Sequence, residues 1–124
     1  MTPYFGNIEK LTVGNEFFRH VLFTGPHAQL VVMSLNVGEE IGTEMHAAVD
    51  QFFRIEQGSA RVVADGKEMS AGAGDAIVIP AGTQHNIINA SDTKKLKLYT
   101  IYSPPNHPDA IIHKTKAEAI SAGD

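Results

Sequence analysis

The sequence predicts an all-β protein, either a sandwich or a barrel. Its apolar runs are short, and turn-forming residues separate them at short intervals along the 124 residues. This spacing is typical of all-β sandwiches and barrels. The strongest local signal is Asp65-Gly66 between two extended arms, which predicts a tight hairpin. The length favours a single domain covering residues 1–124.

The expected strands can be followed in chain order. Residues 17–23 and 28–37 are expected to form a hairpin, because Gly25 and Pro26 lie between them. The remaining strands are expected at 50–58, in two arms within 59–72, at 75–80 (short and buried), at 85–90 and at 95–103. The only helix expected is short and C-terminal, over 116–122, where Thr115 and Glu118 form a capping-box pattern.

The segment 95–103 is apolar on both of its faces beyond Lys97. A strand of this kind needs cover on both sides. One face can meet the barrel interior, and the other must meet either the N-terminal segment or a second subunit. We therefore expect a homodimer.

The composition excludes several classes of protein. A net charge of −4 with ten scattered Lys and Arg residues argues against a nucleic-acid partner. The lack of cysteine excludes disulfides, thiolate nucleophiles and zinc-thiolate sites. The N-terminus has no signal-peptide pattern, and no apolar run is long enough to span a bilayer. No membrane partner and a cytoplasmic location are therefore expected.

Two stretches carry the chemical information. The first, GEEIGTEMHAAVDQFFRIEQG from Gly38 to Gly58, has the pattern G-x5-E-x-H-x4-Q-x6-G. The second, GDAIVIPAGTQHNIIN from Gly74 to Asn89, has the pattern G-x5-P-x-G-x2-H-x3-N. Both resemble the signature motifs of the cupin superfamily, G-x5-H-x-H-x3,4-E-x6-G and G-x5-P-x-G-x2-H-x3-N. The second motif matches at every position, whereas the first has glutamate in place of its first histidine and glutamine in place of its glutamate.

The resemblance, which covers residues 38–89, implies a jelly-roll (double-stranded β-helix) barrel whose strand starts converge on one metal. Alternate residues of a strand face the same way, so a glutamate and a histidine two positions apart would both point inward. The implied cofactor is one divalent transition metal, Zn, Mn, Ni, Co or Fe. The implied ligands are Glu44, His46, Gln51 and His85.

Each of these residues has an alternative interpretation. His85 alone would be a core histidine, and Glu44 could be a solvent-facing carboxylate of an acidic loop. Asp50 could replace Gln51, because the family motif tolerates three or four residues before its acid. The six-residue spacing to Gly58 favours Gln51. Gln51 could also orient a ligand or contact substrate instead of binding metal.

Three functions are compatible with these motifs. The first is a metal-dependent isomerase or lyase acting on a small polar or sugar-like molecule. The second is a non-haem Fe(II) dioxygenase, and the third is a non-catalytic small-molecule-binding or sensor barrel. The sequence has no cluster of Lys and Arg near the two motifs, so a phosphate site is not indicated. His107 has no motif support, and its proline-rich loop could cover either the barrel mouth or a subunit edge.

Overall fold

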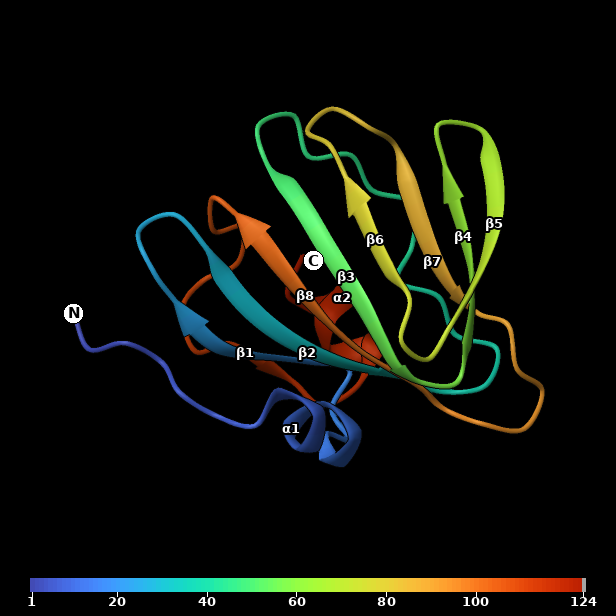
Figure 1. The fold of residues 1–124 in the computed structure, drawn as a ribbon, viewed down its shortest axis with the longest axis horizontal. Coiled ribbons are helices and arrows are strands. Elements are labelled where there is room, and N and C mark those ends of the chain that lie inside the picture. Colours follow the sequence, from blue (N-terminus) through green and yellow to red (C-terminus); the bar gives the residue numbers. More distant parts are fainter. Residues whose placement is uncertain (124) are drawn as a thin grey trace.

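The fold consists of two antiparallel β-sheets packed face to face (Figure 1). The computed structural model describes residues 1–123. The larger sheet has the strand order β6-β3-β8-β2-β1-β9, and the smaller has the order β5-β4-β7. The strands are β1 (Arg19–Thr24), β2 (Gln29–Leu35), β3 (Asp50–Gln57), β4 (Ser59–Ala64), β5 (Lys67–Gly72), β6 (Ala76–Ile79), β7 (His85–Asn89), β8 (Leu96–Ser103) and β9 (Ile112–His113).

Tight turns connect the strands where the sequence predicted them. β1 pairs with β2 across the Gly25-Pro26 connection. β4 pairs with β5 across Asp65 and Gly66, whose φ angles are 51° and 75°. Positive φ at both central residues is the geometry of a type I′ turn, which matches the twist of the strands it joins.

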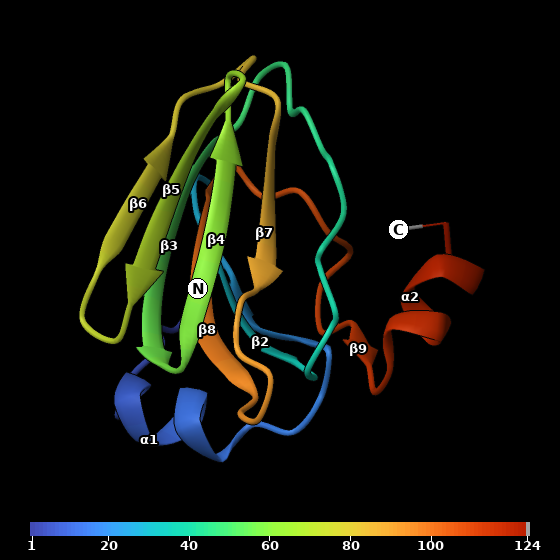
Figure 2. The same cartoon turned by 90° about the vertical axis from the view of Figure 1, so that its right-hand side faces the viewer.

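One hydrophobic core fills the space between the two sheets. Along β3, Phe53 and Ile55 are buried, as the alternation predicted. They face Val62 and Ile87 of the smaller sheet within the same core cluster. Figure 2 shows β4, β5 and β7 lying across β3 and β8. The structure confirms the predicted all-β jelly roll.

A helix that the sequence analysis missed covers the outer face of the larger sheet. Helix α1 spans Ile8–Gly14 and begins at Asn7, whose side chain accepts a hydrogen bond from the Lys10 amide at 3.0 Å. It packs against β2, β3 and β8. The seven-residue segment is too short to show a clear apolar periodicity. The N-terminal segment therefore supplies the cover that β8 needed, and the homodimer stays a prediction.

Two other expectations concern strand β6 and the C-terminus. The expectation of a buried strand at 75–80 is wrong, because β6 lies at the edge of its sheet and Val78 is 65% exposed. The C-terminal helix α2 (Lys116–Ser121) is confirmed, and Thr115 caps it by accepting a hydrogen bond from the Glu118 amide. Within residues 1–123, no helix has the length and apolar character needed to cross a membrane.

Candidate metal centre

Backbone pairing places Glu44 next to His85. The segment before β3 runs along the free edge of β7, and residues 44 and 85 form an antiparallel bridge. The Glu44 amide donates to the His85 carbonyl at 2.8 Å, and the His85 amide donates back at 2.9 Å. Directly opposite residues of an antiparallel pair project to the same side. The two side chains therefore meet, although 40 residues separate them in sequence.

The turn that precedes β7 fixes the same region from the other side. Gly82 has a φ of 83°, which glycine adopts without strain, and its amide donates to the His46 carbonyl at 2.8 Å. The Asp50 carboxylate accepts a hydrogen bond from the Ala81 amide at 2.9 Å. Asp50 is exposed and stabilises this turn, so it is not the residue that faces the cluster.

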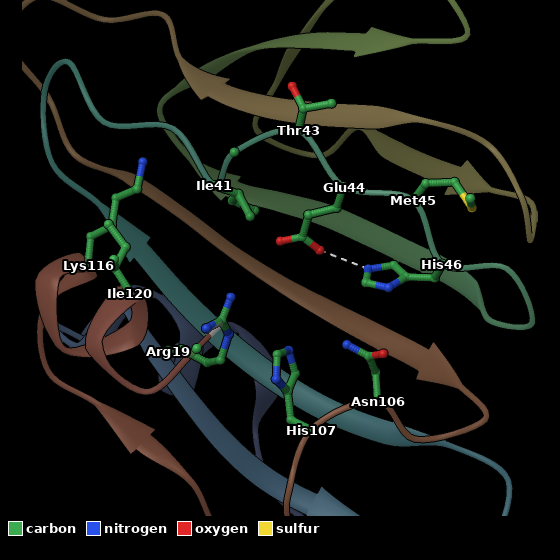
Figure 3. A pocket seen from close by; sticks show the side chains of 12 residues that line it. Arg19, Ile41, Thr43, Glu44, Met45, His46, Asn106, His107, Lys116 and Ile120 are labelled. Atoms are coloured by element: carbon green, nitrogen blue, oxygen red, sulfur yellow. Dashed lines mark hydrogen bonds and ion pairs between the residues drawn. The ribbon is translucent and has the colours of Figure 1, made fainter.

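Three potential metal ligands meet at this point. Donor atoms of Glu44, His46 and His85 all lie within 4.8 Å of one another. The His46 Nε2 and Glu44 Oε2 atoms are 2.8 Å apart. The dashed line in Figure 3 marks this contact. The Glu44 and His46 side chains are partly exposed, whereas His85 is buried. The cluster is thus reachable from solvent on one side and enclosed on the other.

Gln51 lies beside this cluster, and its neighbours fix its orientation. It is 2% exposed, and its Nε2 donates to the Thr100 hydroxyl at 3.0 Å. Its Oε1 therefore faces His85 Nε2, at 3.1 Å. On the opposite side of the ring, His85 Nδ1 donates to the Thr83 carbonyl at 3.0 Å, which leaves Nε2 with a lone pair. In the neutral ring two acceptor atoms therefore face each other, an arrangement that a cation stabilises.

These residues fit a divalent transition metal. Two imidazoles and one carboxylate suit Zn, Fe, Mn, Ni or Co, with protein–metal bonds of about 2.0–2.2 Å for zinc. The His85–Thr83 contact is the backbone hydrogen bond that usually orients a metal-binding histidine. Glu44, His46 and His85 would hold the ion, and the Gln51 oxygen lies within reach of the same space.

Two members of the cluster, Glu44 and His46, form part of the wall of a cavity of about 560 Å³ (Figure 3). This volume lies within the usual range for small-molecule sites. The polar and charged side chains that line it come from four separate parts of the chain. They are Arg19, Thr43, Glu44, His46, Asn106, His107 and Lys116.

The proline-rich loop after β8 lies over the barrel mouth, one of the two positions predicted for it. Gln29, which is buried in β2, holds this loop by accepting hydrogen bonds from the Asn106 and His107 amides at 3.0 and 2.9 Å. The His107 Nε2 lies 3.1 Å from the Tyr102 hydroxyl. His107 thus lines the cavity, although it belongs to neither of the two sequence motifs.

Sequence reasoning also missed two basic residues of the cavity, Arg19 and Lys116. Both lie far from the two motifs, on β1 and at the start of α2. Arg19 did leave a signal, because it has the same strand parity as the core residue Val21. A charged residue at a core position of a strand calls for a partner or a function.

Asn89 has a structural role at the end of β7. Its Nδ2 donates to the carbonyls of Leu35, Asn36 and Lys94 at 3.0–3.2 Å. Its Oδ1 accepts a hydrogen bond from the Ser91 amide. These bonds fix the end of β7 to the loops around it, away from the histidine–carboxylate cluster.

A two-sheet β-barrel with a histidine–carboxylate cluster at its mouth defines the class of this protein as a double-stranded β-helix. The family model described as the cupin domain matches residues 31–102, more than half of the chain. The chain belongs to the cupin domain family.

Its relatives cover nearly the whole chain. The uncharacterized protein YrkC of Bacillus subtilis is 49% identical over 98% of this chain and 68% of its own length. The uncharacterized protein L612 of Acanthamoeba polyphaga mimivirus is 44% identical over 97% of this chain and 77% of its own. The crystal structure of BH2720 from Bacillus halodurans has a TM-score of 0.94 and 43% identity, covering 97% of this chain and 95% of the other. The likeness therefore includes the segments outside the barrel motifs.

Proposed function

We propose that this protein is a metal-dependent enzyme of the isomerase or lyase type that acts on a small polar molecule. The observation that carries the proposal is the position of the cluster. Glu44, His46 and His85 converge on one point, and that point adjoins a cavity large enough for a small molecule. Potential ligands buried in the core away from any cavity would favour a structural metal instead.

The residues divide into three roles. Glu44, His46 and His85 bind the ion, and Gln51 faces the same space with its amide oxygen. A bound divalent ion would supply Lewis-acid polarisation of a substrate carbonyl or hydroxyl. His107 lines the cavity and has its Nε2 positioned by the Tyr102 hydroxyl, so it is the group we assign to move a proton.

The donor set also supports the second candidate function, an Fe(II) dioxygenase. Two histidines and one carboxylate on one face of an ion are the ligands of non-haem iron oxygenases. Metal identity separates the two functions, because oxygen chemistry requires iron whereas Lewis-acid chemistry accepts zinc, manganese, nickel or cobalt. A barrel that binds no metal at all would favour the third candidate, a non-catalytic binding or sensor module.

The test is the metal content of untagged protein, measured by mass spectrometry before and after reconstitution. We expect about one transition-metal ion per chain in the wild type. His85→Ala removes a ligand and is expected to lose the ion. His27→Ala changes an exposed histidine and is expected to keep it.

Circular dichroism of both variants controls for loss of fold. Absence of metal from the reconstituted wild type would contradict the proposal. Equal loading of the wild type and His85→Ala would contradict the assigned ligands. Zinc or manganese would favour the isomerase or lyase, whereas iron together with oxygen uptake would favour the dioxygenase.

A further inference from the structure

We propose that Arg19 and Lys116 form a subsite for a carboxylate group, so that the molecules bound in this cavity are small organic acid anions. The proposal deepens the proposed function and rests on it, because it takes this cavity to be the site of the reaction. Its physical basis is independent of the metal, because it concerns an arginine that belongs to none of the metal-binding motifs.

Within residues 1–123, the buried guanidinium of Arg19 has no acidic partner. Arg19 is 1% exposed, and none of the ion pairs within residues 1–123 involves it. Its Nε has no hydrogen-bond partner. Its Nη1 has only a long contact of 3.4 Å to His113 Nδ1, and the group lies 5.2 Å from the Phe18 ring centroid. An uncompensated buried charge is costly, and an acceptor that binds Nε removes much of that cost.

The position of Arg19 gives an anion access to it. Arg19 extends from β1 toward the cavity that Glu44 and His46 also line, and Figure 3 shows its guanidinium between His107 and the side chains of α2. Lys116, at the start of α2, lines the same cavity. One molecule that spans the cavity can therefore contact the basic side chains and the histidine–carboxylate cluster together.

The charge of the cavity selects an anion. Among the lining residues within 1–123, Arg19 and Lys116 contribute two positive charges and Glu44 one negative charge, in a protein whose net charge is −4. A divalent ion at the cluster would make the cavity more positive. Two cations collected in an otherwise acidic chain indicate selection for a negatively charged ligand.

The shape of the donors favours a carboxylate. A guanidinium presents parallel N–H groups that match the two oxygens of a planar carboxylate. A small acid with a carbonyl or hydroxyl group next to its carboxylate could place the carboxylate against Arg19. The oxygen of its carbonyl or hydroxyl group would then face the histidine–carboxylate cluster.

The experiment measures binding by isothermal titration calorimetry at constant ionic strength, with metal-free and metal-loaded protein. The probes are glycolate, pyruvate and malonate. Glycolamide serves as the neutral analogue of glycolate, and inorganic phosphate serves as the competing oxyanion. We expect the carboxylates to bind metal-free wild-type protein, and glycolamide and phosphate to bind at least tenfold more weakly.

The variants assign this binding to particular residues. Arg19→Met is expected to weaken carboxylate binding roughly 10- to 100-fold, since it removes a charge-assisted pair. Arg19→Lys keeps the positive charge but lacks the parallel N–H groups of a guanidinium, so it should give an intermediate loss of carboxylate affinity. Lys116→Gln, nearer the solvent, should weaken binding about two- to fivefold.

Matched controls remove the same charges elsewhere. Arg61→Met changes an exposed arginine of β4, and Lys114→Gln changes an exposed lysine close to α2. Both controls should bind the carboxylates within twofold of the wild type. Thermal unfolding of each variant verifies that it is folded.

Several outcomes would overturn the proposal. These are failure of the wild type to bind any of the carboxylates, equal affinity for glycolamide, stronger binding of phosphate, and an Arg19→Met variant that binds like the wild type. Binding that requires the metal and is indifferent to Arg19 would place the carboxylate on the ion instead. A wild type that holds no metal but shows Arg19-dependent binding would contradict the proposed enzyme while supporting the subsite.

Discussion

Two buried cations, Arg19 and Lys97, lie on opposite faces of the larger sheet and differ in the partners that surround their charges. Arg19 pairs across β1 and β2 with Met33, and Met33 pairs with Leu98 of β8, so these side chains share the inner face. Lys97 precedes Leu98 and therefore projects from the outer face, toward α1. Each cation is almost completely buried, Arg19 at 1% exposure and Lys97 at 2%.

The surroundings of the two cations differ in how fully they compensate the charge. The Lys97 ammonium donates to the Asn15 carbonyl and to the Glu16 carboxylate. Its hydrogen bond to Glu16, together with that from Lys95, lowers the pKa of Glu16 to about 2. Arg19 has no acid partner within residues 1–123, and its Nε is unpaired. Burial alone therefore does not define a structural cation, because Lys97 has its partners within the fold whereas Arg19 is the cation that we propose to bind a ligand.

The largest expected effect concerns Lys97. Lys97→Met leaves the Asn15 carbonyl without its donor and Glu16 with one cation fewer. We expect a loss of about 2 kcal/mol in the free energy of unfolding, measured by urea denaturation. Lys94→Met, at an exposed position of the preceding loop, is the control. Equal stability of the two variants would remove the structural role of Lys97.

Substitution of Arg19 is expected to change the free energy of unfolding in the opposite direction. Arg19→Met replaces a buried and uncompensated charge with an apolar side chain of similar length. In metal-free protein without ligand, we expect stability to stay the same or to rise by about 1 kcal/mol. The same urea titration measures it. A loss as large as that of Lys97→Met would show that Arg19 supports the fold in the way Lys97 does.

The smallest effect concerns pH. The pKa of Glu16 in the folded protein, about 2, lies below its ordinary value of 4.5. The stabilisation that the ionised Glu16 side chain gives the folded protein is therefore fully present above about pH 4.5 and is lost as the pH falls toward 2. Glu16→Gln should lower the thermal midpoint slightly at pH 7 and make no difference near pH 2. A constant offset across this pH range would contradict the pairing, and added salt should reduce the offset at pH 7.

The sequence could predict the residues of the histidine–carboxylate cluster but not the basic residues of the cavity. The histidines and Glu44 were predictable because the two motifs fix the spacing of short strands and glycine turns, and local geometry does the rest. The six-residue spacing to Gly58 favoured Gln51 over Asp50, and the structure places Gln51 beside His85 and Asp50 at the turn, while a metal ligand role for Gln51 stays a prediction. Arg19 and Lys116 were not predictable as a pair, because only the closure of the barrel brings β1 and α2 to one cavity. Helix α1 was missed because its stability comes from packing on the sheet more than from its own sequence.

Gln29 has a consequence for the rate at which the cavity exchanges its contents. Its amide holds the loop over the mouth through the backbone of Asn106 and His107, and it is fully buried in a strand. The roof of the cavity is thus fixed by the sheet and needs no ligand to order it. A ligand that enters gives up its own freedom without also immobilising the loop. For the proposed enzyme, we therefore expect turnover to be set by the chemical step and by product escape through an open mouth, and not by the opening of a lid.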